Sequence, residues 1–528
     1  MKIRVRNLIL LIALGLIMAT CGTGKSTNLE NEISGTAYYK EKYRPQFHFS
    51  PESGWMNDPN GLVFLDGEFH LFYQYYPDST VWGPMHWGHA VSSDLVHWAH
   101  LPIALYPDSL GYIFSGSAVV DAGNTTGFGS IENPALVAVF TYHNPITEKA
   151  GSDLFQSQGI AYSRDKGRAW IKYPGNPVLQ NPGIRDFRDP KVFRHKESNK
   201  WIMILAVRDR VHLYSSPDLK TWSFESDFGE KTGAHGGVWE CPDLFPLKVE
   251  GSESKRWVML VSINPGGPNG GSATQYFTGN FDGHKFTPDT EGEKWVDWGT
   301  DNYAGVTWSG GPENDGRKIF IGWMSNWNYA TVVPATLWRS AMTIPRELSL
   351  FYENGNYNLK SVPARELKSI RKISKPTAWN KIKYSGEKEI VLDSINLSKR
   401  EIILEFDLGR SNVDTLGIIL ENSEGERFIA GYSVPGRRIY IDRTMSGNSS
   451  FSERFGGISE APYGANERLS MHLFIDASSA ELFIDNGNIV MTSLFFPSDT
   501  YSELKLFSKG KNLFLDNAEF YELESIWP

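Results

Sequence analysis

The chain has 528 residues, which is enough for two or three domains. Its net charge of -9 argues against a nucleic-acid-binding protein, because such proteins present a basic surface. Aromatic residues make up 13% of the chain. Their faces suit stacking on sugar rings, although a β-rich core also explains a high aromatic content.

The first 20 residues have the pattern of a targeting segment. Lys2, Arg4 and Arg6 precede an apolar run at residues 8–18, which is short for a membrane span. The run ends in Met-Ala-Thr-Cys-Gly, and small residues before Cys21 are typical of a bacterial lipoprotein signal. The alternatives are an ordinary cleaved signal and an uncleaved anchor.

On the lipoprotein interpretation, Cys21 carries the lipid and residues 21–42 form a polar tether. We then expect an exported protein that is held at the cell envelope, on its periplasmic face or at the cell surface, by the lipid alone. Cys241 is the only other cysteine, so no disulfide framework is expected.

Most of the chain predicts β-structure, because short alternating segments are separated by Gly, Pro, Asn and Asp. One pattern recurs, in which a strand leads to a Ser/Asp turn and then to an aromatic residue. It ends at Trp98, Trp170, Trp222 and, more weakly, at Phe286. Repeats of this length are typical of four-stranded propeller blades.

A second pattern places an acidic residue just before the proline that opens a strand. It begins at Asp58, at Asp189 and at Glu240, with Cys241 between Glu240 and its proline. Blade starts near residues 58, 115, 189, 240 and 303 predict a five-bladed β-propeller over residues 43–350, with segment 316–325 as a returning strand of the last blade.

Beyond residue 350 the composition changes. Residues 351–375 are polar and basic, and we expect a linker there with a short helix near 363–372. Residues 376–528 return to alternating strands, including a hairpin at 471–487, and predict a β-sandwich domain. This domain supports the propeller on the simpler interpretation and binds glycan on the alternative one.

The three acidic residues hold equivalent places in their repeats. Since the innermost strands of a propeller surround one channel, Asp58, Asp189 and Glu240 should meet at one mouth. Crowded carboxylates repel each other, so at least one pKa should rise. Two carboxylates that flank a glycosidic bond are the usual equipment for its hydrolysis. A Ca²⁺ or Mg²⁺ site and a purely structural Asp-Pro turn are the alternatives.

The neighbouring residues also suit a sugar. Trp55, Asn57, Gln74 and Trp82 offer indoles and amides for stacking and hydrogen bonding. Arg188 adjoins Asp189 and is expected to hold it ionised. Cys241 adjoins Glu240, where it either helps to keep that acid protonated or is a buried structural cysteine.

The sequence resembles glycoside hydrolase family 32, the invertases, inulinases and levanases, over roughly residues 43–525. The resemblance rests on HFSPESGWMNDPNGL, WGPMHWGHAVSSDLVHW, FSGSAVVD, FRDPKVF, WECPDLFPL and RSAMTIPREL, and on FIDASSAELFIDNG near the end. It implies an all-β chain with a five-bladed propeller followed by a β-sandwich. We expect neither a cofactor nor a metal, because the sequence has no Asp-x-Asp-x-Asp loop and no His-x-x-x-His pair.

The resemblance also implies roles. Asp58 would be the nucleophile, Glu240 the general acid and base, and Asp189 the stabiliser of the transition state. The positions that match the family's terminal fructose pocket or adjoin it are Trp55, Met56, Asn57, Gln74, Trp82, Phe114, Ser115, Arg188, Tyr303 and Trp323.

The expected activity is release of fructose from β-fructans (levan or inulin, and sucrose as a further substrate) with retention of configuration. Three alternatives stay open: an endo-acting levanase or inulinase, a fructosyltransferase, and a catalytically silent glycan-binding lipoprotein. The sequence departs from many relatives at Asp78, Ser79 and Leu337, so it leaves the preferred linkage open.

Overall fold

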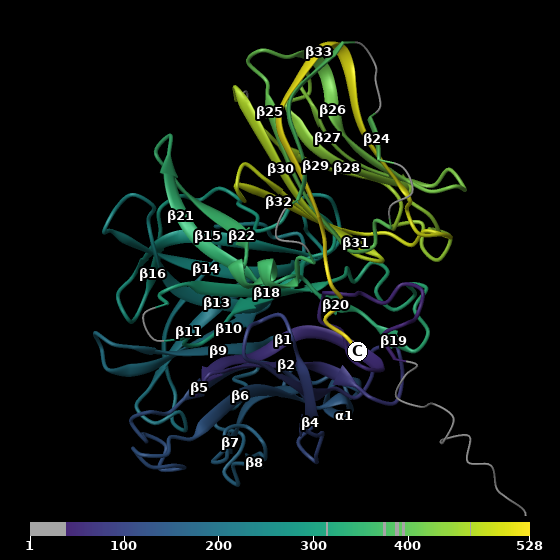
Figure 1. The fold of residues 1–528 in the computed structure, drawn as a ribbon. Helices are drawn as coiled ribbons and strands as arrows, with labels where there is room; N and C mark the ends of the chain where they lie inside the picture. The colour runs from purple at the N-terminus through teal and green to yellow at the C-terminus, as the bar shows by residue number, and fades with distance from the viewer. Residues whose placement is uncertain (1–37, 313–314, 373–375, 386–389, 393–395, 465) are drawn as a thin grey trace, which may run out of the picture. The chain divides into compact units, whose positions relative to one another are not determined.

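The structure is a computed structural model that describes residues 38–312, 315–372, 376–385, 390–392, 396–464 and 466–528. As the alternating pattern predicts, most of the regular structure is β-strand. The strands of the described residues form six sheets (Figure 1). Within these ranges, no helix combines the length and the apolar character that a membrane crossing requires. The predicted lipidation site Cys21 and the signal segment lie outside the described residues.

Five of the sheets are the blades of the predicted propeller. Each blade begins with an innermost strand, and these strands start close to the predicted positions: β1 Gly54–Leu65, β5 Tyr112–Val120, β9 Phe187–His195, β13 Val238–Lys248 and β17 Tyr303–Thr307. The second strands are β2 Glu68–Tyr76, β6 Leu136–His143, β10 Lys200–Val207, β14 Lys255–Asn264 and β18 Lys318–Met324. The predicted five-bladed architecture is therefore confirmed.

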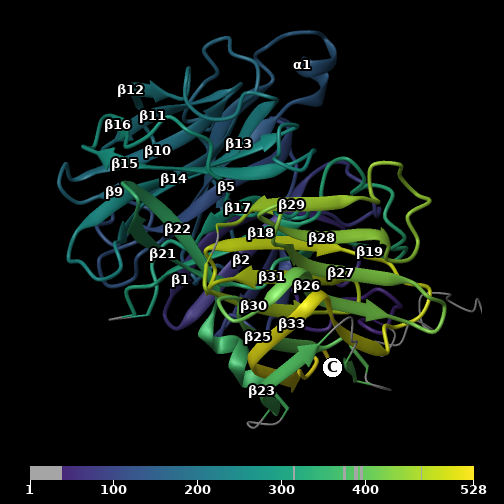
Figure 2. The same cartoon turned by 90° about the horizontal axis from the view of Figure 1, so that it is seen from above.

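The remaining blade strands lie further from the central channel. They are β3 His86–Ser92, β4 Ala99–Leu105, β7 Gln156–Ser163, β8 Ile171–Lys172, β11 Arg210–Ser216, β12 Ser223–Phe228, β15 Ala273–Phe281, β16 Phe286–Pro288, β21 Arg346–Glu353 and β22 Asn356–Pro363. A short helix, α1 Pro145–Lys149, interrupts the connection from β6 to β7. Figure 2 shows the sheets of the third and fourth blades as separate layers.

The first and last blades are joined, which closes the ring. Two short strands, β19 Trp338–Arg339 and β20 Ala341–Met342, pair with β1 and with β18. A second link runs between Val63 and Ser309, which form a parallel bridge. A closed ring of blades leaves only short sheet edges, at the outermost strand of each blade.

The two sequence repeats correspond to different strands of a blade. The acidic residue and the proline belong to the innermost strand, and the Ser/Asp turn follows the third strand. In that turn an aspartate side chain accepts backbone N–H groups from the residues after it: Asp94 from Val96 and His97, and Asp218 from Lys220 and Thr221. This geometry explains why the repeat requires aspartate.

The propeller ends later than the sequence indicates. Strands β21 and β22 form a hairpin of the fifth blade that reaches Pro363, so the propeller passes the predicted end at residue 350 and takes in the first part of the predicted linker. The hairpin is only half-buried, and its polar sequence gives a weak strand signal. The predicted short helix is the 3-10 helix η2 Arg365–Ile370.

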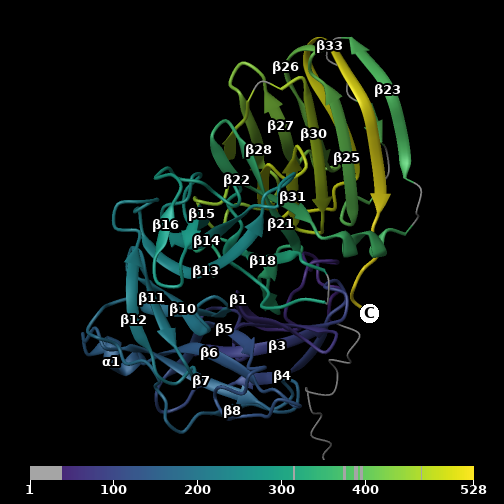
Figure 3. The same ribbon diagram turned by 90° about the vertical axis from the view of Figure 1, so that its left-hand side faces the viewer.

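The C-terminal part forms one eleven-stranded sheet that folds over its own core as a sandwich-like barrel. Its strands are β23 Thr377–Ser385, β24 Ile390–Leu392, β25 Arg400–Asp407, β26 Asn412–Glu421, β27 Arg427–Ser433, β28 Arg438–Met445, β29 Ile458–Pro462, β30 Arg468–Ile475, β31 Ser479–Ile484, β32 Ile489–Leu494 and β33 Glu503–Glu522. The long strand β33 pairs with β26 in its first half and with β25 in its second (Figure 3). The predicted hairpin is β30 with β31.

A buried network of charges connects the two folds. The ring of His48 contacts Asp476 Oδ2 at 2.7 Å and Glu481 Oε1 at 2.9 Å. Arg346, the first residue of β21, bonds to the same Glu481 and lies 3.0 Å from Asp297. All five side chains are almost fully buried. Their burial is tolerated because each charge has an opposite partner.

Candidate active site

In all five blades, the pairing of the innermost strand with the second strand is interrupted near the predicted site residues. Their pairing with the neighbouring strand shifts register between Met56 and Pro59, between Ile113 and Gly116, between Glu240 and Asp243, and between Tyr303 and Val306, and β9 shifts in the same way beside Asp189. Such bulges turn side chains away from the regular alternation. Here Asp58, Ser115 and Asp189 lie within the shifts, and Glu240 and Tyr303 lie at their edges.

Asp58 is held by three donors. Ser115 Oγ donates to Asp58 Oδ2 at 2.7 Å, and Asn57 Nδ2 donates to Oδ1 at 2.9 Å. The thiol of Cys241 lies 3.4 Å from Oδ2. Asn57 is itself fixed by the indole N–H of Trp55, which donates to its side-chain oxygen at 2.8 Å. Side chains of the second and fourth blades thus help to position a carboxylate of the first blade.

Asp189 lies on the other side of the same thiol. Its Oδ2 accepts the backbone N–H of Cys241 at 3.1 Å and lies 3.6 Å from the Cys241 sulfur. The backbone N–H of Asp189 donates to Thr141 Oγ1 at 2.9 Å. Both Asp189 and Cys241 have positive φ, 64° and 46°, which is rare for residues with a side chain and accumulates at functional sites.

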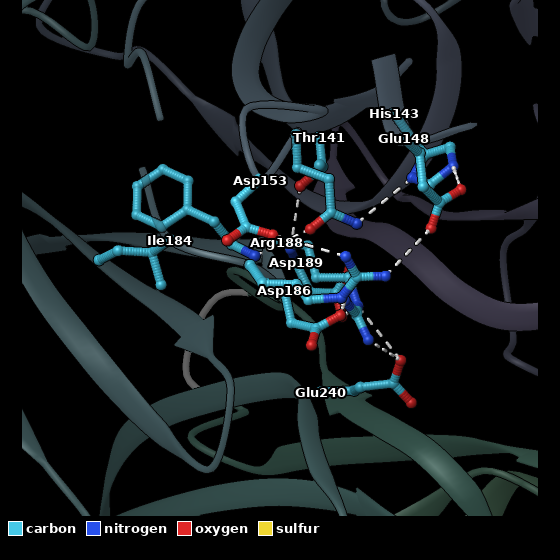
Figure 4. Close-up of polar contacts among 12 residues, drawn as sticks. Thr141, His143, Glu148, Asp153, Ile184, Asp186, Arg188, Asp189 and Glu240 are labelled. Atoms are coloured by element: carbon cyan, nitrogen blue, oxygen red, sulfur yellow. Dashed lines mark hydrogen bonds and ion pairs between the residues drawn. The ribbon is translucent and has the colours of Figure 1, made fainter. Parts of the chain in front are cut away.

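Glu240 is bound by two neighbours. Arg188 donates to Glu240 Oε1 from Nε at 3.2 Å and from Nη2 at 2.7 Å, and the hydroxyl of Tyr303 donates to Oε2. The third nitrogen of the guanidinium, Nη1, bonds to Asp186 at 2.6 Å. Figure 4 shows Arg188 between Asp186 and Glu240.

The structure therefore brings the three predicted carboxylates together, and their electrostatics follow from the crowding. Burial, and then the charge of Glu240, raise the pKa of Asp58. Burial raises the pKa of Asp189 to about 7; Arg188 opposes this, and the charges of Glu240 and Asp58 add to it. The expected rise in pKa is confirmed for these two groups.

Two sequence-based interpretations need correction. Arg188 does lower the pKa of Asp189, but burial outweighs it, and the hydrogen bonds of the guanidinium go to Glu240 and Asp186 instead; Asp189 is 3.9 Å away. The thiol of Cys241 contacts Asp58 and Asp189 rather than Glu240. The bulge explains both, because it turns adjacent side chains in directions that sequence order does not reveal.

The remaining predicted site residues belong to the first, second and fifth blades. Gln74 donates to the carbonyl of Ile113 at 3.0 Å, and Met56 is fully buried. Phe114 stacks on His143 with ring centroids 4.1 Å apart, and Trp82, which is 40% exposed, meets Phe114 edge-on at 6.0 Å. Trp323 lies between Trp55 and Tyr303, at 6.1 and 6.3 Å.

Some site residues were not predicted from the sequence. Asp186 neutralises one side of Arg188, and Thr141 orients Asp189. His143 stacks on Phe114 and pairs with Glu148 at 3.1 Å, while Trp327 packs on Trp55. Only Asp186 gave a sequence signal, since it precedes the FRDP segment by one residue. The others come from second strands and loops, whose proximity only the fold reveals.

Among the described residues, no group of three or more His, Cys, Asp or Glu side chains is arranged to hold a metal ion. The three carboxylates instead share protein donors: a hydroxyl, an amide, a thiol and a guanidinium. This arrangement suits acid–base and nucleophilic chemistry at a sugar.

Comparison with known proteins gives two family matches. Residues 48–363 match the N-terminal domain of glycosyl hydrolases family 32, and residues 366–522 match the C-terminal domain of the same family. The first match covers the propeller and the second covers the sandwich-like sheet.

Individual proteins that are similar to this chain support the family match. The chain is 44% identical to a levanase of Bacillus subtilis over 94% of its own length and 72% of the relative's. It is 39% identical to an extracellular exo-inulinase of Aspergillus ficuum, over 94% and 98% of the two chains.

Among solved structures, the exo-inulinase of Aspergillus awamori superposes with a TM-score of 0.86 at 36% identity, over 93% of this chain and all of that one. A β-fructofuranosidase of Schwanniomyces occidentalis, complexed with fructosyl-erythritol, gives 0.84 at 32% identity, again over 93% of this chain and 100% of that one. By its sequence, its propeller and its sandwich-like domain, this chain belongs to glycosyl hydrolase family 32.

Proposed function

We propose that this glycosidase releases fructose from the ends of β-fructan chains by a retaining double displacement. The observation that carries the proposal is the convergence of Asp58, Asp189 and Glu240 on one buried site at the mouth of the propeller. Relatives named levanase and exo-inulinase, at 44% and 39% identity, support a fructan as the substrate.

In the first half of the proposed reaction, Asp58 attacks the anomeric carbon of the terminal fructose. The donors Ser115 and Asn57 fix the carboxylate and favour its ionised form, which is the attacking species. Glu240 donates its proton to the leaving oxygen, so the glycosidic bond breaks without expelling an alkoxide.

In the second half, Glu240 takes a proton from water, and the hydroxide displaces Asp58 from the fructosyl unit. Tyr303 and Arg188 keep the Glu240 carboxylate in place for both transfers. Asp189, held by the N–H of Cys241, binds hydroxyl groups of the sugar and stabilises the positive charge that develops on the ring. Two displacements retain the configuration.

The proposed pocket for the terminal fructose is built from aromatic and amide side chains. Trp55, Trp82, Phe114 and Trp323 supply the walls, and Asn57 and Gln74 supply hydrogen bonds. Exo-action is supported by the name exo-inulinase of relatives that match over almost their whole length. Within this proposal, the sandwich-like domain supports the propeller.

We further propose that the protein is exported and lipid-anchored. Export is supported by relatives named extracellular. The anchor rests on the small residues that precede Cys21 after a short apolar run. Palmitate labelling of the wild type, lost in Cys21→Ala, would support the anchor; labelling that persists in the variant would contradict it.

Product analysis tests the activity. Levan, inulin and sucrose are digested in parallel, and the products are followed by anion-exchange chromatography. The proposal expects fructose as the first and only product from both polymers, and no product from Asp58→Asn. A ladder of oligosaccharides from the polymers would indicate endo-action, longer products from concentrated sucrose would indicate transfer, and no product at all would indicate a binding protein.

A further inference from the structure

Four polar side chains form a block on one face of the second blade. Thr141 and His143 lie on β6, and Gln156 and Gln158 lie on β7; the register pairs Thr141 with Gln158 and His143 with Gln156. Because alternate residues of a strand point to the same side, all four side chains share one face. Each of the four residues is at most 5% exposed, so each polar group needs a partner inside the protein. We call these four residues the polar block.

The partners of the polar block are backbone groups at the start of β9, in the third blade. Gln156 Oε1 accepts the N–H of Phe187 at 2.8 Å, and Gln158 Nε2 donates to the carbonyl of the same residue at 2.9 Å. Thr141 Oγ1 accepts the N–H of Asp189 at 2.9 Å. Three backbone groups at the start of this strand are therefore held by side chains of the neighbouring blade.

Donors and acceptors match at Gln156 and His143. The N–H of Phe187 only donates, so the atom of Gln156 that faces it is the oxygen, and the amide nitrogen faces His143 Nδ1 at 3.4 Å. This ring nitrogen accepts, so the imidazole proton is on Nε2, which lies 3.1 Å from Glu148 (Figure 4). Gln156 is thus fixed from both sides.

Donors and acceptors also match at Gln158 and Thr141. The carbonyl of Phe187 only accepts, so Gln158 turns its amide nitrogen toward it, and Oε1 accepts the hydroxyl of Thr141 at 2.7 Å. The hydroxyl oxygen of Thr141 is then free to accept the N–H of Asp189. Two buried side chains, each with all its bonds in place, hold this backbone rigidly.

The backbone that the polar block holds carries two groups of the candidate active site. Arg188 donates to Glu240, and Asp189 accepts the N–H of Cys241. Asp186 and Asp189 have positive φ, 56° and 64°, a conformation that costs free energy and persists only where the surroundings enforce it. The bonds from the second blade supply part of that constraint.

We propose that the members of the polar block are positioning residues: through the backbone of residues 187–189 they fix the places of Arg188 and Asp189. This role rests on the proposed function, in which Asp189 stabilises the positive charge that develops on the fructose ring. A displaced carboxylate stabilises that charge less, because the stabilisation depends on a preorganised geometry. The polar block therefore acts on the transition state more than on the bound substrate.

Thr141 offers a matched pair of variants. Thr141→Val keeps the shape but removes the hydroxyl, and Thr141→Ser keeps the hydroxyl. With fructose release from levan or inulin as the assay, we expect Thr141→Val to lower kcat by at least about tenfold, KM to stay within about threefold, and Thr141→Ser to recover most of the rate. A wild-type kcat in Thr141→Val would overturn the proposal, whereas a wild type that releases no fructose would overturn the proposed function itself.

Thr126→Val separates positioning from stability. The hydroxyl of Thr126 donates to Asp121 at 2.6 Å and accepts the N–H of Phe128 at 3.2 Å, so it is buried and bonded in the same way as that of Thr141. Thr126 follows the end of β5, whereas Ser115 lies near the start of that strand. We expect a comparable fall in melting temperature with the kcat of the wild type. An equal fall in kcat for Thr126→Val and Thr141→Val would overturn the proposal.

Inhibition by a cationic sugar analogue gives a second readout, which does not depend on the fraction of folded enzyme. A five-membered cyclic amine with the hydroxyl groups of fructose carries, when protonated, the charge that develops in the transition state. We expect Thr141→Val and Gln156→Met to weaken its inhibition by about tenfold, and inhibition by fructose by less than about threefold. Equal weakening of both inhibitors would overturn the proposal. Gln156→Met carries the test if Thr141→Val does not fold.

Discussion

At the residue scale, the candidate site contains a row of three charged side chains. Asp186, Arg188 and Glu240 form a line in which one guanidinium is shared by two carboxylates. Asp186 holds Nη1 of the guanidinium, and Nε and Nη2 donate to Glu240. Asp186 thereby fixes the direction from which Arg188 meets Glu240.

Replacement of Asp186 should therefore lower activity. In Asp186→Asn the amide keeps the shape but not the charge, so Arg188 is held less firmly against Glu240. We expect kcat at neutral pH to fall by roughly 10-fold while KM changes little. Asp153→Asn, at an exposed ion pair with Arg185, is the control. Equal kcat values for both variants would contradict a positioning role.

Asp58 should make the fold less stable at neutral pH. Since burial and Glu240 raise its pKa above the unfolded value, its ionised form is disfavoured in the folded state, and stability is lost as pH rises through that range. We expect Asp58→Asn to raise the free energy of unfolding by about 1–3 kcal/mol at pH 7 while abolishing activity. The gain should vanish below about pH 4, where Asp58 is protonated in both states. Denaturant unfolding at the two pH values measures this; a loss of stability at pH 7 would contradict it.

At the element scale, the same devices recur in different blades. The innermost strands share a bulge at the site residues, and an aspartate turn follows the third strands. The turn was readable in the sequence because side chain and backbone interact locally. The bulge could not be predicted from the sequence, because it depends on pairing between strands. It determines which side chains Arg188 and Cys241 contact.

The aspartate turn can be tested in the third blade. Asp218 accepts the N–H groups of Lys220 and Thr221 at 2.9 and 2.8 Å. Asp218→Ala leaves these groups without their acceptor, and we expect a loss of about 1–2 kcal/mol in the free energy of unfolding. Asp218→Asn retains an acceptor oxygen and should stay within about 0.5 kcal/mol of the wild type. Thermal or urea unfolding distinguishes the two.

At the scale of the whole molecule, the number of blades and the sandwich-like domain followed from repeats and alternation. The fifth blade's last hairpin did not, because β21 and β22 bury few side chains and read as a polar linker. The charge network between the folds was equally hidden, since His48, Arg346 and Glu481 are far apart in the sequence. Packing that joins distant segments leaves no local pattern.

The network should make stability depend on pH. Burial lowers the pKa of His48, but hydrogen bonds to Asp476 and Glu481 outweigh it and raise the pKa to about 9. The folded pKa exceeds the unfolded value, so the stabilisation is complete below about pH 6.5 and is lost as pH rises through 9. We expect His48→Gln to cost about 3 kcal/mol at pH 6 and much less at pH 10.

The exposed pair of His97 with Asp94 provides a control for this prediction. His97→Gln should change the free energy of unfolding by less than about 1 kcal/mol at either pH. A cost for His48→Gln that does not vary between pH 6 and pH 10 would contradict the proposed charge on His48.

The proposed double displacement is tested most directly by the first product that the enzyme releases. Nuclear magnetic resonance of levan in the first minutes of digestion identifies both the product and its anomeric configuration. We predict free β-fructofuranose as the first product, followed by slower mutarotation, and no signal with Asp58→Asn. Release of the α-anomer first, or of oligofructosides in place of fructose, would contradict it.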